Sequence, residues 1–269
     1  MTDIKNRYEL KCLGYFFYVI VAFLIQCNDA VSNTPEDGNV YGTMTDIDGN
    51  EYKTIKIGGQ TWMTENLRVK SYNDGEPINQ INELRAWGLD TIGAFCFYNN
   101  TTNSDTIERY GALYSYYAVL SQKLAPTGWR VPTKEDWEEL ESYLISQKFN
   151  WDESLSGNKI GKALASRSEW DTLSEPGVVG NDLNQNNASG FNAYPSGSRI
   201  YRGTREYTVP QEDNGFEKAG KECNWWTSSG YVSSAWYYGL GFDYERLKLS
   251  GTNALSAGFS IRLIKEEDK

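Results

Sequence analysis

Carboxylates and aromatic rings are the abundant groups in this sequence that could carry chemistry, because its 269 residues include no histidine. Histidine is the commonest general base and a frequent zinc or copper ligand, so its absence removes the usual catalytic triads and most such metal sites. A glycosidase needs two carboxylates about 5–10 Å apart. The densest group, Glu135, Asp136, Glu138 and Glu139, lies in a predicted helix, where most carboxylates form a solvated face. We therefore expect no enzyme activity, with a hydrolase as the less favoured alternative.

Aromatic residues make up 14% of the chain, and half of them are tyrosines. Tyrosine and tryptophan among short polar residues are typical of recognition surfaces, because rigid rings offer contact area at a low cost in entropy. Alternation along a strand places Trp236 and Tyr238 on one face, opposite Tyr237, so only one face can meet a ligand. By the same alternation, Trp225 or Trp226 should be buried whatever the function is.

Two polar stretches are candidates for calcium, and both are weak. Residues 46–50 (DIDGN) resemble the start of an EF-hand loop, but glycine stands fourth instead of sixth and the twelfth residue is Ile57. The Asp48-Gly49 pair instead predicts a hairpin turn. The second candidate, Asn181, Asp182 and Asn184, offers oxygen ligands but few carboxylates. We expect no cofactor, with calcium at this second stretch as the open alternative.

Four cysteines divide by position. Cys12 lies in an apolar N-terminal run, and Cys27 follows the end of that run. The remaining two, Cys96 and Cys223, could form a disulfide in an exported protein. They could equally be two buried thiols that pack as small apolar residues, because sequence alone does not show whether they lie close enough to bond.

The N-terminus predicts export. Lys5, Arg7 and Lys11 precede a 13-residue apolar run, 13–25, which is the length of a signal-peptide core and too short to span a membrane comfortably. Its end, LIQC, resembles a lipobox, with Cys27 as the lipidated residue, although Gln26 stands where a small residue is usual. An ordinary signal peptide or short anchor is the alternative. We predict a lipoprotein signal peptide at 1–26 and localisation to the outer membrane or cell surface.

Charge and composition then limit the partners. Residues 28–39 are small, polar and proline-containing, which predicts a flexible tether at 27–39. Without residues 1–26 the net charge becomes −11, and no basic stripe is present. Nucleic acid is therefore excluded as a partner, and membrane attachment should occur through lipid only.

Hydrophobic periodicity predicts few regular elements. Short β-rich runs at 40–45, 52–57 and 60–63 indicate hairpins, and aromatic strands return at 222–228, 235–244 and 257–264. Helical spacing occurs at 112–122 and 133–145. In the second helix Thr133 is a good N-cap after Pro132, and Trp137, Leu140 and Leu144 share one face. Loops dominate beyond residue 150. This pattern predicts one α+β domain at 40–265, with a charged tail at 266–269.

Six ordered motifs resemble the Fibrobacter succinogenes major paralogous domain, found in exported proteins and lipoproteins. They are DIDGNEYKTIKIGGQTWMTENLR (46–68), GALYSYYA (111–118), PTGWRVPTKEDWEEL (126–140), GFNAYPS (190–196), WWTSS (225–229) and GFSIRLI (258–264). More distantly, the WRxPT…WE and GFxxR units are similar to the formylglycine-generating branch of the C-type lectin-like fold. The resemblance implies that fold, with two helices, small antiparallel sheets and long irregular loops.

The sequence departs from both patterns at cysteine positions. The family often has a cysteine pair where this chain has Ala125 and Leu263, so this domain should lack the cross-link that the pair would provide. Formylglycine-generating enzymes use two cysteines near the C-terminal end, whereas Cys223 is alone there. That activity is therefore not expected.

Some lectin-like proteins of this branch bind ligands through the segment before the final strand, which here is 231–253. The resemblance therefore implies a non-catalytic envelope recognition module for glycan or surface protein, acting in adhesion or scavenging. A structural or assembly component of the envelope or of a surface appendage is the alternative. The candidate ligand-binding residues are Tyr231, Trp236, Tyr237, Tyr238, Asp243, Tyr244, Arg246, Lys248 and Asn253.

Overall fold

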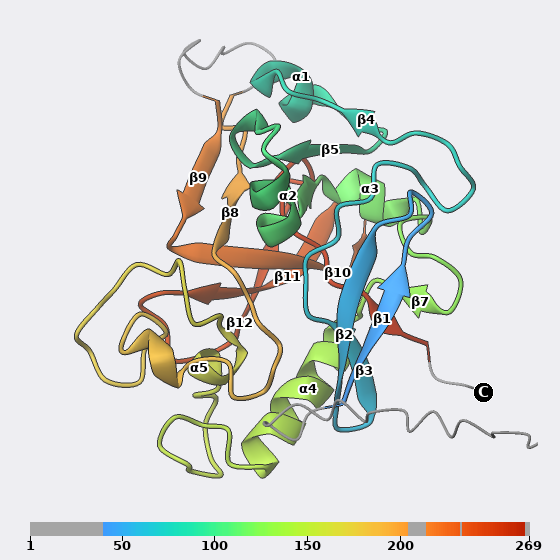
Figure 1. Cartoon of the computed structure of the whole chain (residues 1–269). Helices are drawn as coiled ribbons and strands as arrows, with labels where there is room; N and C mark the ends of the chain where they lie inside the picture. Colours follow the sequence, from blue (N-terminus) through green and yellow to red (C-terminus); the bar gives the residue numbers. More distant parts are fainter. Residues whose placement is uncertain (1–39, 204–213, 232, 267–269) are drawn as a thin grey trace, which may run out of the picture. The chain divides into compact units, whose positions relative to one another are not determined.

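The computed structural model describes residues 40–203, 214–231 and 233–266 (Figure 1). The predicted signal peptide, the lipidation candidate Cys27, the whole predicted tether and most of the charged tail lie outside these residues. Within them the chain forms three sheets and five α-helices, which together make an α+β arrangement.

The first sheet is built mostly from the predicted N-terminal hairpins. Its strands are β1 (Tyr41–Thr45), β2 (Glu51–Ile57), β3 (Gln60–Met63), β13 (Ile264–Lys265) and β7 (Trp129–Arg130), in the order β1-β2-β3-β13-β7. All its pairs are antiparallel. The β1–β2 turn contains Gly49 at φ 81°, a left-handed conformation that glycine adopts without strain. The hairpin predictions are confirmed.

The second sheet gathers the C-terminal strands. Its order is β12 (Lys248–Thr252), β11 (Ser234–Gly241), β10 (Glu222–Tyr231), β8 (Ser196–Arg199) and β9 (Phe216–Ala219). The sequence predicted β10 and β11 but missed β8, β9 and β12, which have little of the apolar alternation of strands. A third sheet, which the sequence analysis did not predict, joins β4 (Asn79–Gln80), β5 (Ala94–Phe97) and β6 (Ala112–Tyr114).

The prediction of two helices is wrong in number. The described residues form α1 (Leu84–Leu89), α2 (Ser104–Tyr110), α3 (Tyr116–Leu120), α4 (Lys134–Ser146) and α5 (Gly161–Leu164), with short 3₁₀ turns at Tyr98–Asn100 and Leu183–Gln185. The predicted helix at 112–122 begins as strand β6, because Leu113 pairs with Cys96 of β5, and only its second half is helical. Strand pairing overrides the local helical spacing there. The prediction for α4 is confirmed, including Thr133 as its N-cap.

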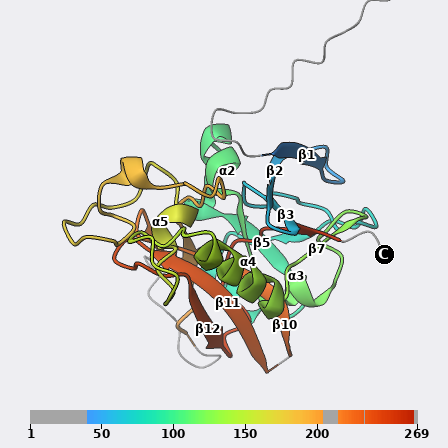
Figure 2. The ribbon, with the colours of Figure 1, turned by 90° about the horizontal axis from the view of Figure 1, so that it is seen from below.

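Both faces of the second sheet are buried at its centre, around β10. Trp226 and Ala235 belong to a core cluster on one face, and Trp225 and Tyr238 belong to the cluster on the other face. The prediction that one of Trp225 and Trp226 is buried therefore understates the result, since both are fully buried. Helix α4 lies across β10 and β11 and covers the second face (Figure 2).

Candidate functional site

The tryptophans and tyrosines of β11 divide between core and surface. Trp236 is 40% exposed, whereas Tyr238, on the same face, is 2% exposed and stacks on Trp137 of α4 with ring centroids 5.2 Å apart. Tyr237 lies on the opposite face and packs against Trp226 and Phe259. The structure is consistent with the expected alternation, but Tyr238 is a core residue. It can present no more than an edge to a ligand.

Trp236 is the exposed platform of this region. Its cross-strand partner in β12 is Gly251, and a β-carbon added to that glycine would lie 3.2–3.6 Å from three ring carbons of the indole. The ring therefore lies over the glycine, whose lack of a side chain lets it approach the strand. One surface of the indole is supported by backbone while part of it stays open to solvent.

A groove of about 720 Å³ lies between α4 and the β11–β12 pair, on the same sheet face as Trp236. Helix α4 supplies one wall with Glu138, Glu141 and Ser142, and Tyr238 and Leu249 line it from the strands. The remaining lining residues are Asn158 from the loop after α4, Arg246 and Leu247 from the loop before β12, and Lys248, the first residue of β12. The groove thus contains three of the sequence-predicted residues, Tyr238, Arg246 and Lys248.

Carboxylates give the helical wall of the groove its electrostatic character. Burial and then the neighbouring Glu138 raise the pKa of Glu141, against a hydrogen bond from Asn158. Burial also raises the pKa of Tyr238, with further contributions from Glu138, Glu141 and Glu135. Glu138 is itself paired with Lys134 at 2.8 Å. The wall therefore offers hydrogen-bond acceptors, and Arg246 on the loop side offers donors.

The position of the carboxylates bears on hydrolysis. Glu138 and Glu141 are three residues apart on α4, so they lie on one wall of the groove. A glycosidase places its two carboxyl groups on either side of the scissile bond. This arrangement suits hydrogen bonding to a ligand better than acid–base attack from two sides.

The other predicted residues do not join this groove. Tyr237 and Tyr244 line a small cavity of about 60 Å³. Lys248 borders this cavity as well as the groove, and its ammonium lies 5.4 Å from the Tyr244 ring centroid. Asp243 is exposed in the loop before β12. Tyr231, 79% exposed, and Asn253 lie at the other end of the β10–β11–β12 strands, as the pairing register shows. The predicted set is therefore at least two separate surfaces.

A lysine ammonium binds the carbonyl oxygens of the loop that was the alternative candidate for calcium. Lys162 is 5% exposed, and its ammonium donates hydrogen bonds to the backbone oxygens of Val178, Asn181 and Asp182, at 3.5 Å for the first and 3.3 Å for the last. A fixed positive charge at these oxygens repels a second cation. The Asp182 carboxylate accepts from Gln185. Among the described residues no group of three or more acidic or cysteine side chains is placed to hold a metal.

The two cysteines lie apart in the core. Cys96 belongs to a small cluster with Trp87, Ala94 and Leu113, whereas Cys223 belongs to the large cluster around α4. Both are buried free thiols, which is the second of the two alternatives. Burial raises the pKa of Cys96 to about 12 and also raises that of Cys223.

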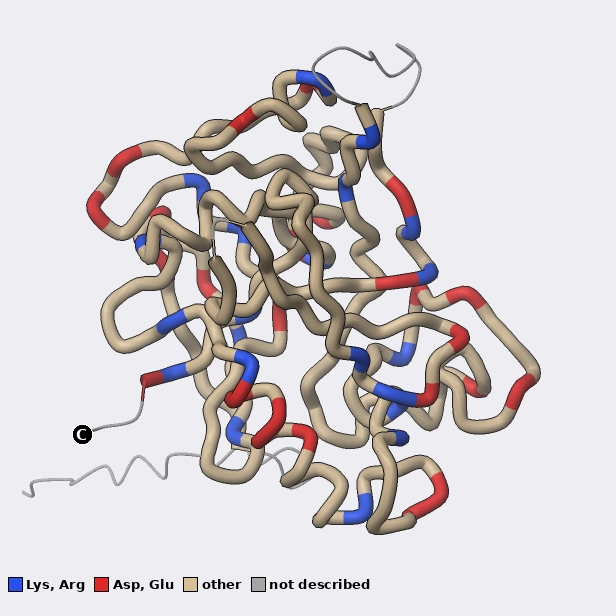
Figure 3. The backbone as a smooth tube through the Cα atoms, turned by 180° about the vertical axis from the view of Figure 1, so that it is seen from behind, with Lys and Arg blue, Asp and Glu red and all other residues tan. Residues whose placement is uncertain are grey.

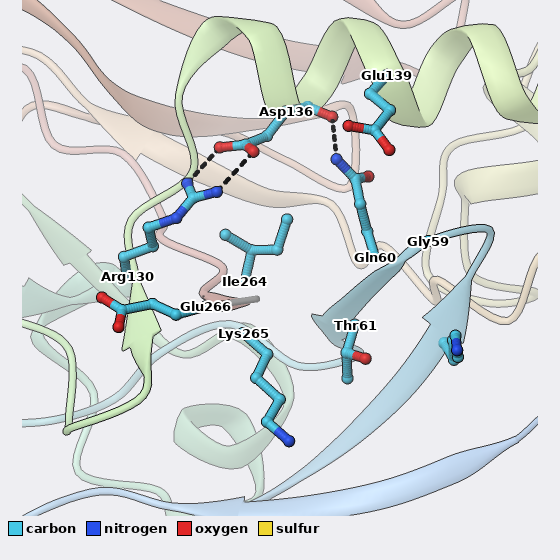
Figure 4. Close-up of a pocket in the computed structure, with 10 residues that line it drawn as sticks. Gly59, Gln60, Thr61, Arg130, Asp136, Glu139, Ile264, Lys265 and Glu266 are labelled. Atoms are coloured by element: carbon cyan, nitrogen blue, oxygen red, sulfur yellow. Dashed lines mark hydrogen bonds and ion pairs between the residues drawn. The ribbon is translucent and has the colours of Figure 1, made fainter. Parts of the chain in front are cut away.

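The start of α4 faces a separate polar cavity of about 380 Å³ (Figure 4). Arg130 donates to both carboxylate oxygens of Asp136, one at 2.7 Å, and the Gln60 amide donates to the Asp136 backbone oxygen at 3.0 Å. Gln60 also accepts from the indole of buried Trp62. These hydrogen bonds join β3 and β7 to α4. The WRVPTKEDW stretch therefore has a structural role here.

Charge elsewhere is mixed. Acidic and basic residues are interspersed over the side shown in Figure 3, without a basic stripe.

The sequence analysis did not predict Glu141, Asn158 and Leu249 as groove residues. The spacing of Glu138 and Glu141 beside the apolar stripe of α4 could have indicated Glu141. No pattern in the sequence indicates that Asn158 and the strand with Leu249 lie opposite that helix.

Comparison with known proteins gives one match. The family described as Fibrobacter succinogenes major domain (Fib_succ_major) matches residues 55–265. Neither a curated protein nor a solved structure matches the chain.

Proposed function

Because the chain belongs to the Fibrobacter succinogenes major domain family, we propose that it is a non-catalytic recognition module that binds glycans at the cell envelope. The observation that carries this proposal is the Trp236 indole, held over Gly251 beside the groove between α4 and β11–β12. An exposed, backbone-supported indole offers a flat apolar surface, which fits the C–H face of a sugar ring.

The groove supplies the polar half of such a site. Sugar hydroxyls donate and accept hydrogen bonds, and the groove offers both kinds of partner. Glu138 and Glu141 accept, whereas Arg246 donates. With a volume of about 720 Å³ it has room for a sugar beyond the one that stacks on Trp236. No cofactor is needed for this mode of binding.

We also infer a C-type lectin-like fold. The order of the family motifs supports it, as do the α+β arrangement, the small antiparallel sheets and the irregular stretch between α4 and β8. Some lectin-like proteins of this branch bind ligands through the segment before the final strand, and Trp236 lies in that segment here.

Lipid attachment through Cys27 would place the module at the outer membrane or cell surface. None of the helices in the described part of the chain is long and apolar enough to cross a membrane. Palmitate labelling tests the anchor: we expect incorporation in the native protein and none in Cys27→Ala. Equal labelling of both would contradict lipidation at this residue.

A glycan array tests recognition, with Trp236→Ala as the variant. Trp151→Ala is the matched control, because Trp151 is about equally exposed (42%) but lies in the loop after α4 and not on the sheet face that carries Trp236 and Tyr238. We expect the native protein and Trp151→Ala to bind the same glycans, and Trp236→Ala to lose at least about tenfold in affinity, the scale of one lost stacking platform. Absence of binding to every glycan would sink the proposal.

An assembly role is the second candidate, favoured by strand β12. It ends the second sheet, and its outer edge is unpaired among the described residues. An open edge can accept a strand of another protein. Cross-linking in cells that captures a constant protein partner, unaffected by Trp236→Ala but lost when Ser250 is changed to proline, would favour assembly over glycan binding.

A further inference from the structure

The groove beside Trp236 contains a hydroxyl that the chain holds in place but does not pair. Tyr238 lines this groove and is 2% exposed, and its ring stacks on that of Trp137. Its hydroxyl makes no hydrogen bond with any described residue. The oxygen is not one of the unpaired polar atoms sealed inside the described core, so the groove gives access to it. A fixed, unpaired hydroxyl at such a position is available to a ligand.

Glu141, on the helical wall of the same groove, is a half-buried carboxylate without a counter-ion. No described lysine or arginine forms an ion pair with it. Burial and then the charge of Glu138 raise its pKa, against a hydrogen bond from Asn158. Glu138 is paired with Lys134 at 2.8 Å, but this is an exposed contact within one helix, and such pairs contribute little. The wall therefore keeps negative charge that the chain does not neutralise.

Negative charge also dominates around the Tyr238 hydroxyl. Besides burial, three carboxylates of α4 raise the pKa of Tyr238, namely Glu138, Glu141 and Glu135. The two cations of the groove lie elsewhere: the Lys248 ammonium is 5.4 Å from the Tyr244 ring centroid, and Arg246 is exposed on the loop side. The whole chain has a formal net charge of −10, which adds a field of the same sign.

An ammonium group is the chemical complement of these acceptors. It carries a positive charge and three N–H donors, and it has no acceptor. The groove offers it the carboxylates of Glu138 and Glu141 and the oxygen of Tyr238. A neutral ligand would leave the charge of Glu141 unbalanced, and an acidic sugar would be repelled by it.

We propose that the groove is specific for amino sugars, with Glu141, Glu138 and Tyr238 binding the free ammonium group of one sugar while an adjoining ring of the glycan stacks on Trp236. This inference rests on the proposed glycan binding and names the class of glycan. Glu141 is the residue that determines the specificity.

Amino sugars and their N-acetyl forms are suitable probes, because each pair differs only in having an ammonium or a neutral acetamide. Methyl glycosides of glucosamine and galactosamine are titrated into the full chain at about pH 6.5, where amines are charged. The backbone N–H resonance of Leu249, which lines the groove, follows binding. Glu141→Gln removes the charge and keeps the shape of the side chain. Glu139→Gln is the matched control, because Glu139 is an exposed carboxylate of the same helix that borders the separate polar cavity.

We expect the native protein to bind the amines at least about fivefold more tightly than their N-acetyl forms. Glu141→Gln should weaken amine binding about 5- to 30-fold and leave N-acetyl binding unchanged, because only the charge is lost. Tyr238→Phe should weaken amine binding about 2- to 12-fold without lowering the melting temperature, since its hydroxyl has no partner in the chain. Glu139→Gln should behave as the native protein.

Two results would overturn the amino-sugar specificity. One is a native protein that binds amines no more tightly than N-acetyl sugars, or that shows no shift of Leu249 with either. The other is a preference for amines that Glu141→Gln leaves intact. If neutral glycans bind through Trp236 on the array while amines show no preference, glycan recognition survives and the amino-sugar specificity fails. If no glycan binds and a lysine-rich peptide occupies the groove in a Glu141-dependent manner, the ligand is a protein and both proposals fail.

Discussion

Asp46 shows at the scale of one residue why the DIDGN stretch is a turn. Its carboxylate accepts four hydrogen bonds: from the backbone N–H groups of Asp48 and Asn50 at 3.0 Å each, from the Asn50 amide at 2.8 Å, and from the Tyr52 hydroxyl at 2.6 Å. These donors take the oxygens that a metal would need. The carboxylate organises the hairpin by itself.

Replacing Asp46 with alanine should lower the free energy of unfolding by about 1–3 kcal/mol, because the O–H of buried Tyr52 loses its acceptor and keeps only the hydrogen bond that it accepts from the Arg68 N–H. Urea denaturation measures the change, and Asp46→Asn, which keeps one acceptor oxygen, should lose less. Calcium should leave the melting temperature of the native protein unchanged relative to a chelator. A calcium-dependent rise abolished by Asp46→Ala would restore the metal-loop interpretation.

The two cysteines make a second prediction at this scale. Burial raises the pKa of Cys96 to about 12, so the reactive thiolate is scarce at neutral pH, and Cys223 is equally buried. We expect an alkylating reagent to leave both unmodified in the native protein and to modify both after unfolding without reductant. Mass spectrometry that shows modification only after reduction would mean that the two form a disulfide.

At the scale of the element, the N-terminus of α4 is a reciprocal cap. The Thr133 hydroxyl accepts from the Asp136 backbone N–H at 3.2 Å, and the Asp136 carboxylate accepts from the Thr133 backbone N–H at 2.6 Å. Thr133→Ala should lower the free energy of unfolding by about 0.5–2 kcal/mol, whereas Thr133→Ser should retain most of it. Equal stability of the two variants would show that the cap contributes nothing.

The same cap should make stability depend on pH. Burial alone would raise the pKa of Asp136, but Arg130 and the Thr133 N–H outweigh it and lower the pKa below its ordinary value. A depressed pKa contributes stability above the ordinary carboxyl range and loses it as the pH falls through the folded-state value. The stability difference between the native protein and Asp136→Asn should therefore be constant above about pH 5 and shrink below about pH 4. Urea denaturation across this range checks the sign.

At the scale of the whole described molecule, Trp137 connects the elements. Its ring lies 4.8 Å from that of Trp62 in the first sheet, 5.6 Å from Trp225 in the second, and 5.8 Å from Phe191 in the loop before β8. The residue is fully buried. One helix thereby anchors two sheets through one side chain.

Trp137→Ala should lower the free energy of unfolding by about 3–5 kcal/mol, the usual cost of emptying an aromatic core position. Trp137→Phe should lose less, because it keeps a ring and removes an indole N–H that has no partner among the described residues. Urea denaturation and near-ultraviolet circular dichroism measure both. The exposed Trp151→Ala is the control, and a comparable loss there would contradict a special role for Trp137.

The sequence alone determined the features that depend on neighbours along the chain. The hairpin around Asp48-Gly49, the capped helix after Pro132 and the alternation of Trp236, Tyr237 and Tyr238 follow from turn chemistry, capping and strand geometry. These act over a few residues, so they can be read without the fold.

Tertiary structure decided what depends on residues far apart in the sequence. Leu113 is a strand residue because it pairs with Cys96 of β5. Both Trp225 and Trp226 are buried because the sheet is covered on two faces around them. Tyr238 is a core residue because it stacks on Trp137. The candidate groove, too, exists only because α4 lies against β11 and β12, which begin about 90 residues or more after the helix ends. Burial and pairing between distant segments are set by packing of the whole chain, and local sequence patterns do not encode which segments meet.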